Sequence, residues 1–380
     1  MPEVNQFKVF STEGTGVRRD RELPSLLIIF SAMPDFSIGV DLGGTNLRIA
    51  AVSAAGELLE KVEVTTKLAL GRDHVIHEMC TAIQVLSGKY EKTGSFRGVG
   101  IGIPGLMEVQ SGTVLKAANL PGWENYAVRA EIERRLGLPK NAARVVLEND
   151  ARVAALGEQW LGAGRGVENM AILTLGTGIG GGIVLGGKIW HGVNGMAGEF
   201  GHVTIEPEGP RCGCGNRGCA EQYASAGAIV RMAREAIDGV EAVALAQGAA
   251  SGAEFGAKAI YDLVLGGDLD ARRIFQTVGW ALGILLADLV NVLNLEMFVI
   301  GGGVSRAWDA FAPRMFEELR QRSVVYAATV PFDLGKDNVF SRETADQSER
   351  DAERRTIITQ ARLGGDAGLY GATRLPWLSD

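Results

Sequence analysis

Cysteines, long apolar runs and dense basic runs are scarce in this sequence. Four cysteines in 380 residues do not make a disulfide framework, so we expect a reducing compartment and a cytoplasmic protein. The net charge is −7 and no lysine or arginine stripe occurs, which argues against nucleic acid as a partner. No apolar run has membrane-spanning length, so no membrane partner is expected. The longest candidate, Leu282 to Leu295, is interrupted by Asp288 and Asn291 and predicts a buried helix.

Glycine, in contrast, is abundant. The 52 glycines are about twice the usual share, and they gather in short turns rather than at a fixed period. This pattern indicates backbone that approaches a ligand closely, and it argues against a collagen-like or low-complexity chain. With 46% hydrophobic residues, a chain of this length can bury one large core or two moderate ones, and two domains are the better expectation.

The first 35 residues differ from the rest. Arg18, Arg19 and Arg21 precede a short apolar patch, Leu26 to Phe30, as in a signal peptide. The patch is shorter than a typical signal-peptide core and lacks a small-x-small cleavage site, so we set that interpretation aside. The segment is predicted to be a disordered leader, or to precede a translation start at Met33.

Three of the four cysteines fall within eight positions, at Cys212, Cys214 and Cys219, and His202 lies just upstream. Thiolates and an imidazole are the ligands that tetrahedral structural zinc prefers. Glycines 213, 215 and 218 let the backbone fold tightly enough for the sulfurs to face one point. The alternative is a disulfide pair with a spare thiol, which the expected compartment disfavours.

From Ser37 onward, segments with the spacing of strands and helices alternate. In the first half, the predicted strands are 38–41, 47–53, 57–65, 96–103 and 144–147, and the predicted helices are 75–86 and 128–136. Cys80 lies near the apolar face of the first helix and is expected to be a core thiol.

The order of elements then restarts. The predicted strands of the second half are 171–175, 183–185, 297–300 and 324–330, and its helices lie near 154–160, 221–236, 271–293 and 307–322. Two similar halves suggest an internal structural duplication in an α/β protein. The polar stretch 341–355 is predicted to be a solvated loop or a helix end.

A glycine turn follows the first strand, in the segment Asp41-Leu-Gly43-Gly44-Thr45-Asn46. Small residues in such a turn let backbone N–H groups point at an anion, and Thr45 and Asn46 add side-chain donors. Asp41, at the strand end, is a candidate to hold Mg²⁺ directly or through water. The alternative interpretation is an ordinary hairpin turn.

A second turn, Gly176-Thr177-Gly178, begins a run with the G-x-G-x-x-G spacing of dinucleotide-binding folds. That motif needs a helix after the glycines, but the apolar segment 183–185 follows, so the run predicts a β-hairpin. A near-match to the P-loop also fails, because Ile189 replaces the required Ser or Thr. Two such hairpins suit a triphosphate clamped across a cleft, and Gly301-Gly302-Gly303 offers a third close approach, suited to a nucleoside.

Asn149 and Asp150 stand at the carboxyl end of a predicted strand, where open α/β sheets bind ligands. A carboxylate there can accept a hydroxyl proton as that oxygen attacks phosphorus. Capping of the next helix by either residue is the alternative, and both roles are compatible.

Two more carboxylates, Glu199 and Glu221, lie beside the metal-ligand cluster, and vicinal hydroxyls are their natural partners. A buried Glu–Arg pair is the alternative interpretation. Asn119 adds an amide beside Trp123, which suits a polyol.

These motifs together resemble the ROK family of repressors and kinases, most closely its bacterial glucokinases. The resemblance runs from about Ile38 to Ala372 and is most specific in the zinc region, 198–225. It implies an actin-like, hexokinase-type (ribonuclease H-like) fold with two α/β domains around a cleft. We expect a small domain at 36–149, a large domain with the zinc loop at 150–364, and a C-terminal helix, about 365–380, that packs back on the small domain.

The resemblance also assigns roles to residues. Asp150 matches the catalytic base, and Asp41 to Asn46 and Gly176 to Gly178 match the positions that take the ATP phosphates. The candidate sugar-binding residues are Gly105, Asn119, Asn149, Glu199, His202 and Glu221, and the implied zinc ligands are His202, Cys212, Cys214 and Cys219. Asn46 departs from the family, since many members have Lys there. The leader is too short for the DNA-binding domain of the family's repressors.

The sequence therefore predicts an ATP-dependent hexose kinase that requires Mg²⁺, carries structural zinc and acts on glucose. A kinase for N-acetylmannosamine, N-acetylglucosamine or fructose remains an alternative, although Gln222-Tyr223 resembles the glucose enzymes. A non-catalytic sugar sensor is the alternative from another class. An NAD-dependent oxidoreductase is disfavoured by the missing helix. Homodimers or homotetramers are common in the family.

Overall fold

The computed structural model describes residues 35–92, 94–117, 119–138, 145–239, 242–250, 255–329 and 355–378. The predicted leader, with Met33 at its end, and most of the polar stretch 341–355 lie outside these residues. The chain from Pro34 onward forms one compact unit, and the fold described below belongs to it.

The first sheet has the order β3-β2-β1-β4-β8. Its strands are β1 (Phe36–Leu42), β2 (Asn46–Ser53), β3 (Leu58–Thr65), β4 (Phe96–Ile103) and β8 (Val145–Asn149). The first three pair antiparallel, whereas β4 is parallel to β1 and β8 is parallel to β4. Helices α1 (Arg72–Tyr90) and α2 (Val128–Leu136) belong to the same half, together with a small sheet of β5 (Leu106–Glu108), β6 (Thr113–Lys116) and β7 (Tyr126–Ala127).

The apolar spacing that predicted α1 explains how it packs. Its buried positions recur every three or four residues and face the core of this half. Cys80 is 4% exposed, and burial raises the pKa of its thiol to about 11. Cys80 is therefore an inert core thiol, as predicted.

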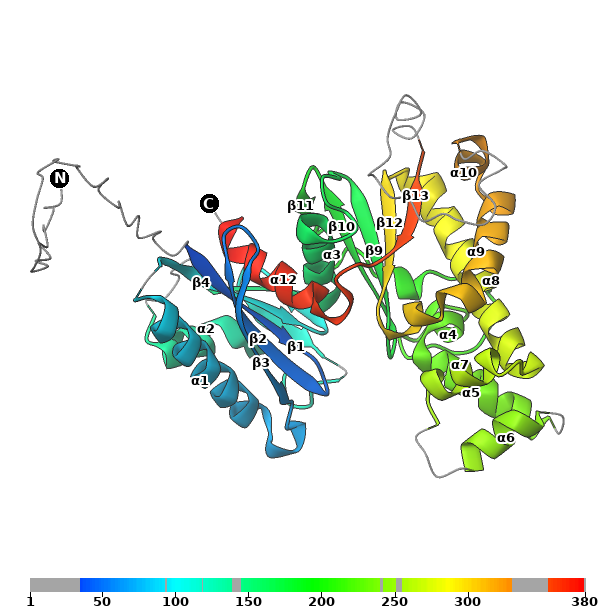
Figure 1. Ribbon diagram of the computed structural model, residues 1–380, viewed down its shortest axis with the longest axis horizontal. Helices are drawn as coiled ribbons and strands as arrows, with labels where there is room; N and C mark the ends of the chain where they lie inside the picture. The colour runs from blue at the N-terminus through cyan, green and yellow to red at the C-terminus, as the bar shows by residue number, and fades with distance from the viewer. Residues whose placement is uncertain are drawn as a thin grey trace, which may run out of the picture. The chain divides into compact units, whose positions relative to one another are not determined.

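The second sheet repeats this arrangement in the order β11-β10-β9-β12-β13 (Figure 1). Its strands are β9 (Met170–Leu175), β10 (Ile179–Leu185), β11 (Lys188–Ile189), β12 (Met297–Gly301) and β13 (Ile357–Gln360). Strands β9 to β11 pair antiparallel, and β12 and β13 continue parallel, as in the first sheet. The matching order and direction confirm the predicted duplication.

Two helices, α3 (Asp150–Leu161) and α12 (Ala367–Arg374), pack against each other (Figure 1). α12 lies on β1, β2 and β4 of the first sheet, whereas α3 contacts β9 and β10 of the second. Glycines allow this close approach, since a Cβ at Gly371 would lie 1.6 Å from the carbonyl oxygen of Val153. The pair therefore connects the two sheets.

The remaining helices gather around the second sheet. They are α4 (Glu221–Ala224), α5 (Ala226–Asp238), α6 (Val243–Ala250), α7 (Ala257–Leu265), α8 (Leu269–Leu293), α9 (Trp308–Arg322) and α10 (Val324–Thr329). Among the described helices, α8 is the one long and apolar enough to cross a membrane by length and composition. Its apolar residues are largely buried in the core, and it packs along α9, as predicted for a buried helix.

The predicted strand 324–330 is wrong, because the segment Val324–Thr329 forms α10. Its β-branched composition favours a strand, but tertiary packing overrides that preference. The backbone N–H of Tyr326 donates to the Ser323 hydroxyl, and Tyr326 is buried while Val324 is exposed. The helix predicted near 221–236 is also interrupted, at Ser225, whose side chain caps α5.

Candidate active site

The segment Glu148-Asn149-Asp150 joins β8 to α3. The Asn149 side chain caps α3, because its Oδ1 accepts from the backbone N–H groups of Ala151 (3.0 Å) and Arg152 (3.3 Å). Its Nδ2 donates to the Gly105 carbonyl oxygen at 3.2 Å. Asp150 is the first residue of α3, and its Oδ1 accepts from the N–H of Ala151 at 2.9 Å. Backbone contacts thus hold Asn149 and Asp150 in place.

Asp150 faces a cavity of about 160 Å³. Asp41 at the end of β1 lines the same cavity, as do Gly301 and Gly302, which end β12 and follow it. A stretch that follows β13 completes the lining with Gly364, Gly365, Ala367 and Gly368. Strand ends from both sheets therefore meet at one cavity, where α/β sheets bind ligands. Gly303 lies outside the lining, in open space.

The electrostatics of this cavity favour a cation. Burial, and after it the charge of the neighbouring Asp150, raise the pKa of Asp41 to about 6, although Arg48 acts in the opposite direction. Burial also raises the pKa of Asp150, and the charge of Glu199 contributes in the same direction. Two carboxylates that share one cavity repel each other, and a divalent cation between them would relieve that repulsion. Asp41 and Asp150 therefore fit a Mg²⁺ site.

The first glycine turn is the β1–β2 hairpin. Its backbone closes through the bond from Gly43 N–H to the Asn46 carbonyl at 2.9 Å. The tip residues Gly44 and Thr45 are exposed, and Asn119 lies beside Gly44. The hairpin is therefore free to take a ligand at its tip, and Asn119 lies close to that tip.

The second glycine turn connects β9 to β10, which confirms the predicted hairpin. A Cβ at Gly178 would lie 2.2 Å from Oε2 of Glu221, so a larger residue there would displace that carboxylate. The same oxygen accepts from the N–H of Ile179 at 3.0 Å. No atom approaches within 4 Å of a Cβ built on Gly176, so that residue faces open space. The hairpin thus holds a sugar-binding candidate, Glu221, against its own backbone.

The glycines that follow have a packing role. A Cβ at Gly181 would lie 2.2 Å from the Gly198 carbonyl oxygen, and one at Gly182 would lie 2.9 Å from Cα of Arg152. The G-x-G-x-x-G spacing here therefore reflects close packing of β10 against its neighbours rather than a dinucleotide-binding turn.

The four predicted metal ligands converge. The ligand atoms of His202, Cys212, Cys214 and Cys219 all lie within 4.8 Å of one another. Nδ1 of His202 is 3.7 Å from Sγ of Cys212, and the sulfurs of Cys214 and Cys219 are also 3.7 Å apart. Two sulfurs bound to tetrahedral zinc at about 2.3 Å would lie about 3.7–3.8 Å apart. The cluster fits structural zinc, whereas a disulfide needs about 2.05 Å.

Three sugar-binding candidates, His202, Glu199 and Glu221, belong to this cluster or lie near it in the fold. His202 turns Nδ1 toward Cys212, so Nε2 lies on the opposite edge of the ring. Oε1 of Glu221 lies 3.9 Å from Sγ of Cys212. Glu199 is exposed and precedes the short 3-10 helix Phe200–His202. Its negative charge helps to raise the pKa of Asp150. Glu199 thus lies close enough to influence Asp150, whereas Glu221 lies against the β9–β10 hairpin.

The sequence analysis missed several residues of the site. Thr174 and the pair Gly364-Gly365 line the cavity, and Arg48 bonds both Asp41 (3.3 Å) and the Gly365 carbonyl (2.9 Å). Gly364-Gly365 lie between β13 and α12, and a glycine pair between a strand and a helix predicts a turn. The short strand β13 was not recognised from the sequence, so this turn was not predicted. Arg48 lies opposite Asp41 across the β1–β2 hairpin, but its bond to Gly365 joins residues 317 positions apart and carried no sequence signal.

Comparisons with known proteins agree with this geometry. The sequence model of the ROK family matches residues 37–376. A glucokinase of Halalkalibacterium halodurans is 39% identical over 88% of this chain and 92% of its own length. A glucokinase of Thermotoga maritima is 40% identical over 76% of this chain and 87% of its own length.

Solved structures show the same fold. A ROK family glucokinase from Streptomyces griseus, determined in complex with glucose and AMPPNP, superposes with a TM-score of 0.68. It is 32% identical, and the match covers 90% of this chain and 98% of that structure. The actin-like fold expected from the sequence is thereby confirmed.

Proposed function

This chain belongs to the ROK family, and from that premise we propose that it is a glucokinase, which transfers the γ-phosphate of ATP to the 6-hydroxyl of glucose. One observation carries the proposal. Asp41 and Asp150, two carboxylates with raised pKa values, line a single glycine-walled cavity at strand ends. That arrangement suits a metal-bound phosphate and a hydroxyl that must lose a proton.

Asp150 is the proposed base. Its raised pKa makes it a stronger base than an ordinary carboxylate, and the first turn of α3 fixes its position. Asn149, Glu199 and Glu221 offer acceptors and donors for the sugar hydroxyls, together with Nε2 of His202. Gly105 accepts the amide of Asn149 and so fixes the orientation of that side chain.

The nucleotide is proposed to lie across the two hairpins. The backbone of Gly43 to Asn46 and of Gly176 to Gly178 would bind the phosphates, and Gly301 and Gly302 would approach the nucleoside. Mg²⁺, when bound near Asp41, neutralises charge on the phosphates. Closure of a small domain (36–149) on a large one (150–364) would exclude water.

The cluster of His202 and three cysteines is proposed to hold zinc in a structural role, since four protein ligands leave no open position for chemistry. His202 would bind the metal through Nδ1, which leaves Nε2 for a hydroxyl group of the sugar. We further propose a cytoplasmic homodimer or homotetramer that acts on small molecules, without nucleic-acid or membrane partners.

A sugar panel tests the proposed function. ADP release with Mg-ATP is measured for glucose, mannose, N-acetylmannosamine, N-acetylglucosamine and fructose. We expect kcat/KM to be highest for glucose. Preference for another sugar would overturn the substrate assignment, and ATP binding without turnover on any sugar by folded, zinc-loaded protein would overturn the assignment as an enzyme.

A further inference from the structure

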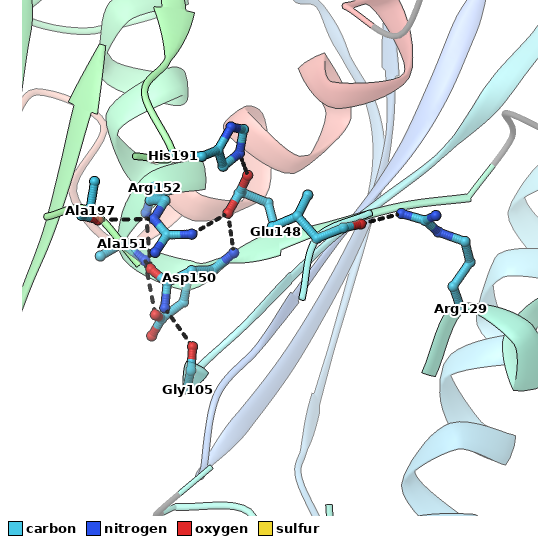
Figure 2. Close-up of polar contacts among 10 residues, drawn as sticks. Gly105, Arg129, Glu148, Asp150, Ala151, Arg152, His191 and Ala197 are labelled. Carbon is cyan, nitrogen blue, oxygen red and sulfur yellow. Dashed lines mark hydrogen bonds and ion pairs between the residues drawn. The ribbon is translucent and has the colours of Figure 1, made fainter. Parts of the chain in front are cut away.

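Glu148 is a buried carboxylate that the mechanism above does not use. Its side chain is 2% exposed, yet it contacts three donors (Figure 2). Oε1 accepts from the backbone N–H of Asn149 at 2.8 Å and from Nη1 of Arg152 at 3.0 Å. Oε2 contacts Nε2 of His191 at 2.5 Å. An ionised carboxylate only accepts, so this contact is a hydrogen bond in the tautomer of His191 that has its proton on Nε2.

Two of these donors connect Glu148 to the loop that follows β11. His191 stands near the start of this loop, and Nε of Arg152 donates to the carbonyl oxygen of Ala197, near its end, at 3.3 Å (Figure 2). The loop also closes on itself, because the Ala197 N–H donates to the His191 carbonyl at 3.1 Å. The next residues along the chain lead directly to Glu199. The start of the loop is therefore bonded to the end of β8, and its end is bonded to the first turn of α3.

The position of Glu148 decides what this arrangement can do. It directly precedes Asn149 and Asp150, so a movement of its side chain is transmitted to the turn that carries them. Burial of a charge pair such as Glu148–Arg152 adds little net stability over an apolar pair of the same shape. The Glu148–Arg152 pair instead fixes geometry, because a charged, hydrogen-bonded pair permits few side-chain arrangements.

We propose that Glu148 is a positioning residue for the sugar, with His191 and Arg152 as its two links to the loop 191–199. It fixes the distance between the turn that carries Asn149 and Asp150 and the loop that carries Glu199. Loss of the His191 link is expected to act on the sugar rather than on the nucleotide, since neither His191 nor Ala197 lines the cavity shared by Asp41 and Asp150. The proposal rests on the proposed function for its kinetic consequence, but not for the contacts themselves.

The test removes one link and leaves the buried pair intact. The His191 side chain is 39% exposed, so its truncation does not leave a buried cavity. His191→Ala removes the bond, whereas His191→Gln keeps an N–H donor of similar reach. His77→Ala is the matched control, because His77 is an exposed histidine on α1, outside this network. Glucose KM, ATP KM and kcat are measured for each, with hydrogen exchange of the Ala197 amide.

For His191→Ala we expect a glucose KM raised about tenfold or more, the scale of one charge-assisted bond, with an ATP KM within about twofold of wild type. The Ala197 amide should exchange faster, and His191→Gln should restore most of both effects. Equal rises in both KM values, or unchanged glucose KM and exchange, would overturn the proposal. If the Ala197 amide exchanges faster in His191→Ala but neither variant nor wild type phosphorylates any sugar, the proposed function would be overturned. The connection from Glu148 to the loop 191–199 would still be supported.

Discussion

Two carboxylates that face one small cavity cannot ionise as freely as they do in water. Asp41 and Asp150 are in this situation, and burial is the main cause of the raised pKa of each. We interpret their mutual repulsion as a feature of a cation-binding site, because a bound cation would remove the repulsion. Without a bound cation, the repulsion between these two carboxylates should therefore lower the stability of the folded protein.

The first prediction concerns Asp41→Asn. The pKa of Asp41 is raised from 3.8 to about 6, so ionised Asp41 destabilises the fold. The unfolded chain releases this proton at lower pH than the folded protein, so the contribution of Asp41 to wild-type stability should fall as pH rises from about 4 to 6. Asp41→Asn should therefore be more stable than wild type at pH 7.5, by about 1–3 kcal/mol, and this difference should disappear at pH 4. Denaturant unfolding without Mg²⁺ measures it, and a constant difference at both pH values would contradict the account.

A second prediction concerns Gly178→Ala. The new Cβ would meet Oε2 of Glu221, so that carboxylate must leave the N–H of Ile179. We expect glucose KM to rise about tenfold with little loss of thermal stability, since one charged hydrogen bond is displaced. Gly256→Ala is the control, because no atom lies near its added methyl group. An unchanged glucose KM in Gly178→Ala would show that Glu221 does not contact the sugar.

At the scale of elements, the metal loop gives a third prediction. Cys219 and Cys80 are both buried, but only Cys219 belongs to the four-residue cluster. Cys219→Ser should lose zinc and melt at a lower temperature, whereas Cys80→Ser should retain zinc in a one-to-one ratio with the chain. Atomic emission spectroscopy of the purified variants measures the metal. Equal zinc content in Cys219→Ser and wild type would exclude the proposed ligand set.

The junction between α3 and the segment after β13 gives a fourth prediction. Glu158 is fully buried, and its carboxylate accepts from the backbone N–H groups of Ala163 (2.8 Å), Arg362 (3.0 Å) and Leu363 (2.7 Å). The stretch from Gly364, which lines the cavity, follows immediately. Glu158→Gln should cost about 1–3 kcal/mol of stability and raise the KM for ATP more than that for glucose.

Exposed Glu317 on α9 provides the control, as Glu317→Gln. The two variants are compared by denaturant unfolding and by KM measurements under the same conditions. A Glu158→Gln protein with wild-type stability and wild-type ATP KM would mean that this junction does not position the nucleotide cavity.

At the scale of the whole molecule, the sequence predicted the sheets better than the site. The sequence located β4 and α2 to the residue, because β4 is a nearly continuous buried strand that ends before Pro104-Gly105, and α2 is a regular helix with Gly137 as its C-terminal cap. The short strand β13 and the helix α10 were missed or misassigned, since their conformations depend on neighbours distant in the chain.

The site shows the same limit. The cysteines could be recognised because metal ligands cluster in sequence, and Asp150 because it follows a strand. The bond between Glu148 and His191 joins residues 43 positions apart, and that between Lys61 and Asp366 joins residues 305 apart. No local pattern encodes such pairs, so they emerge only from the folded chain.

The central claim is that Asp150 accepts the proton of the attacking hydroxyl. The most direct test is the turnover of Asp150→Asn with glucose and saturating Mg-ATP, beside its glucose affinity by calorimetry. Asparagine retains an oxygen for the N–H of Ala151, so the fold of the turn should persist. The account predicts a kcat lower by about 10²–10⁴-fold with a glucose Kd close to that of wild type. Turnover at the wild-type rate would contradict it.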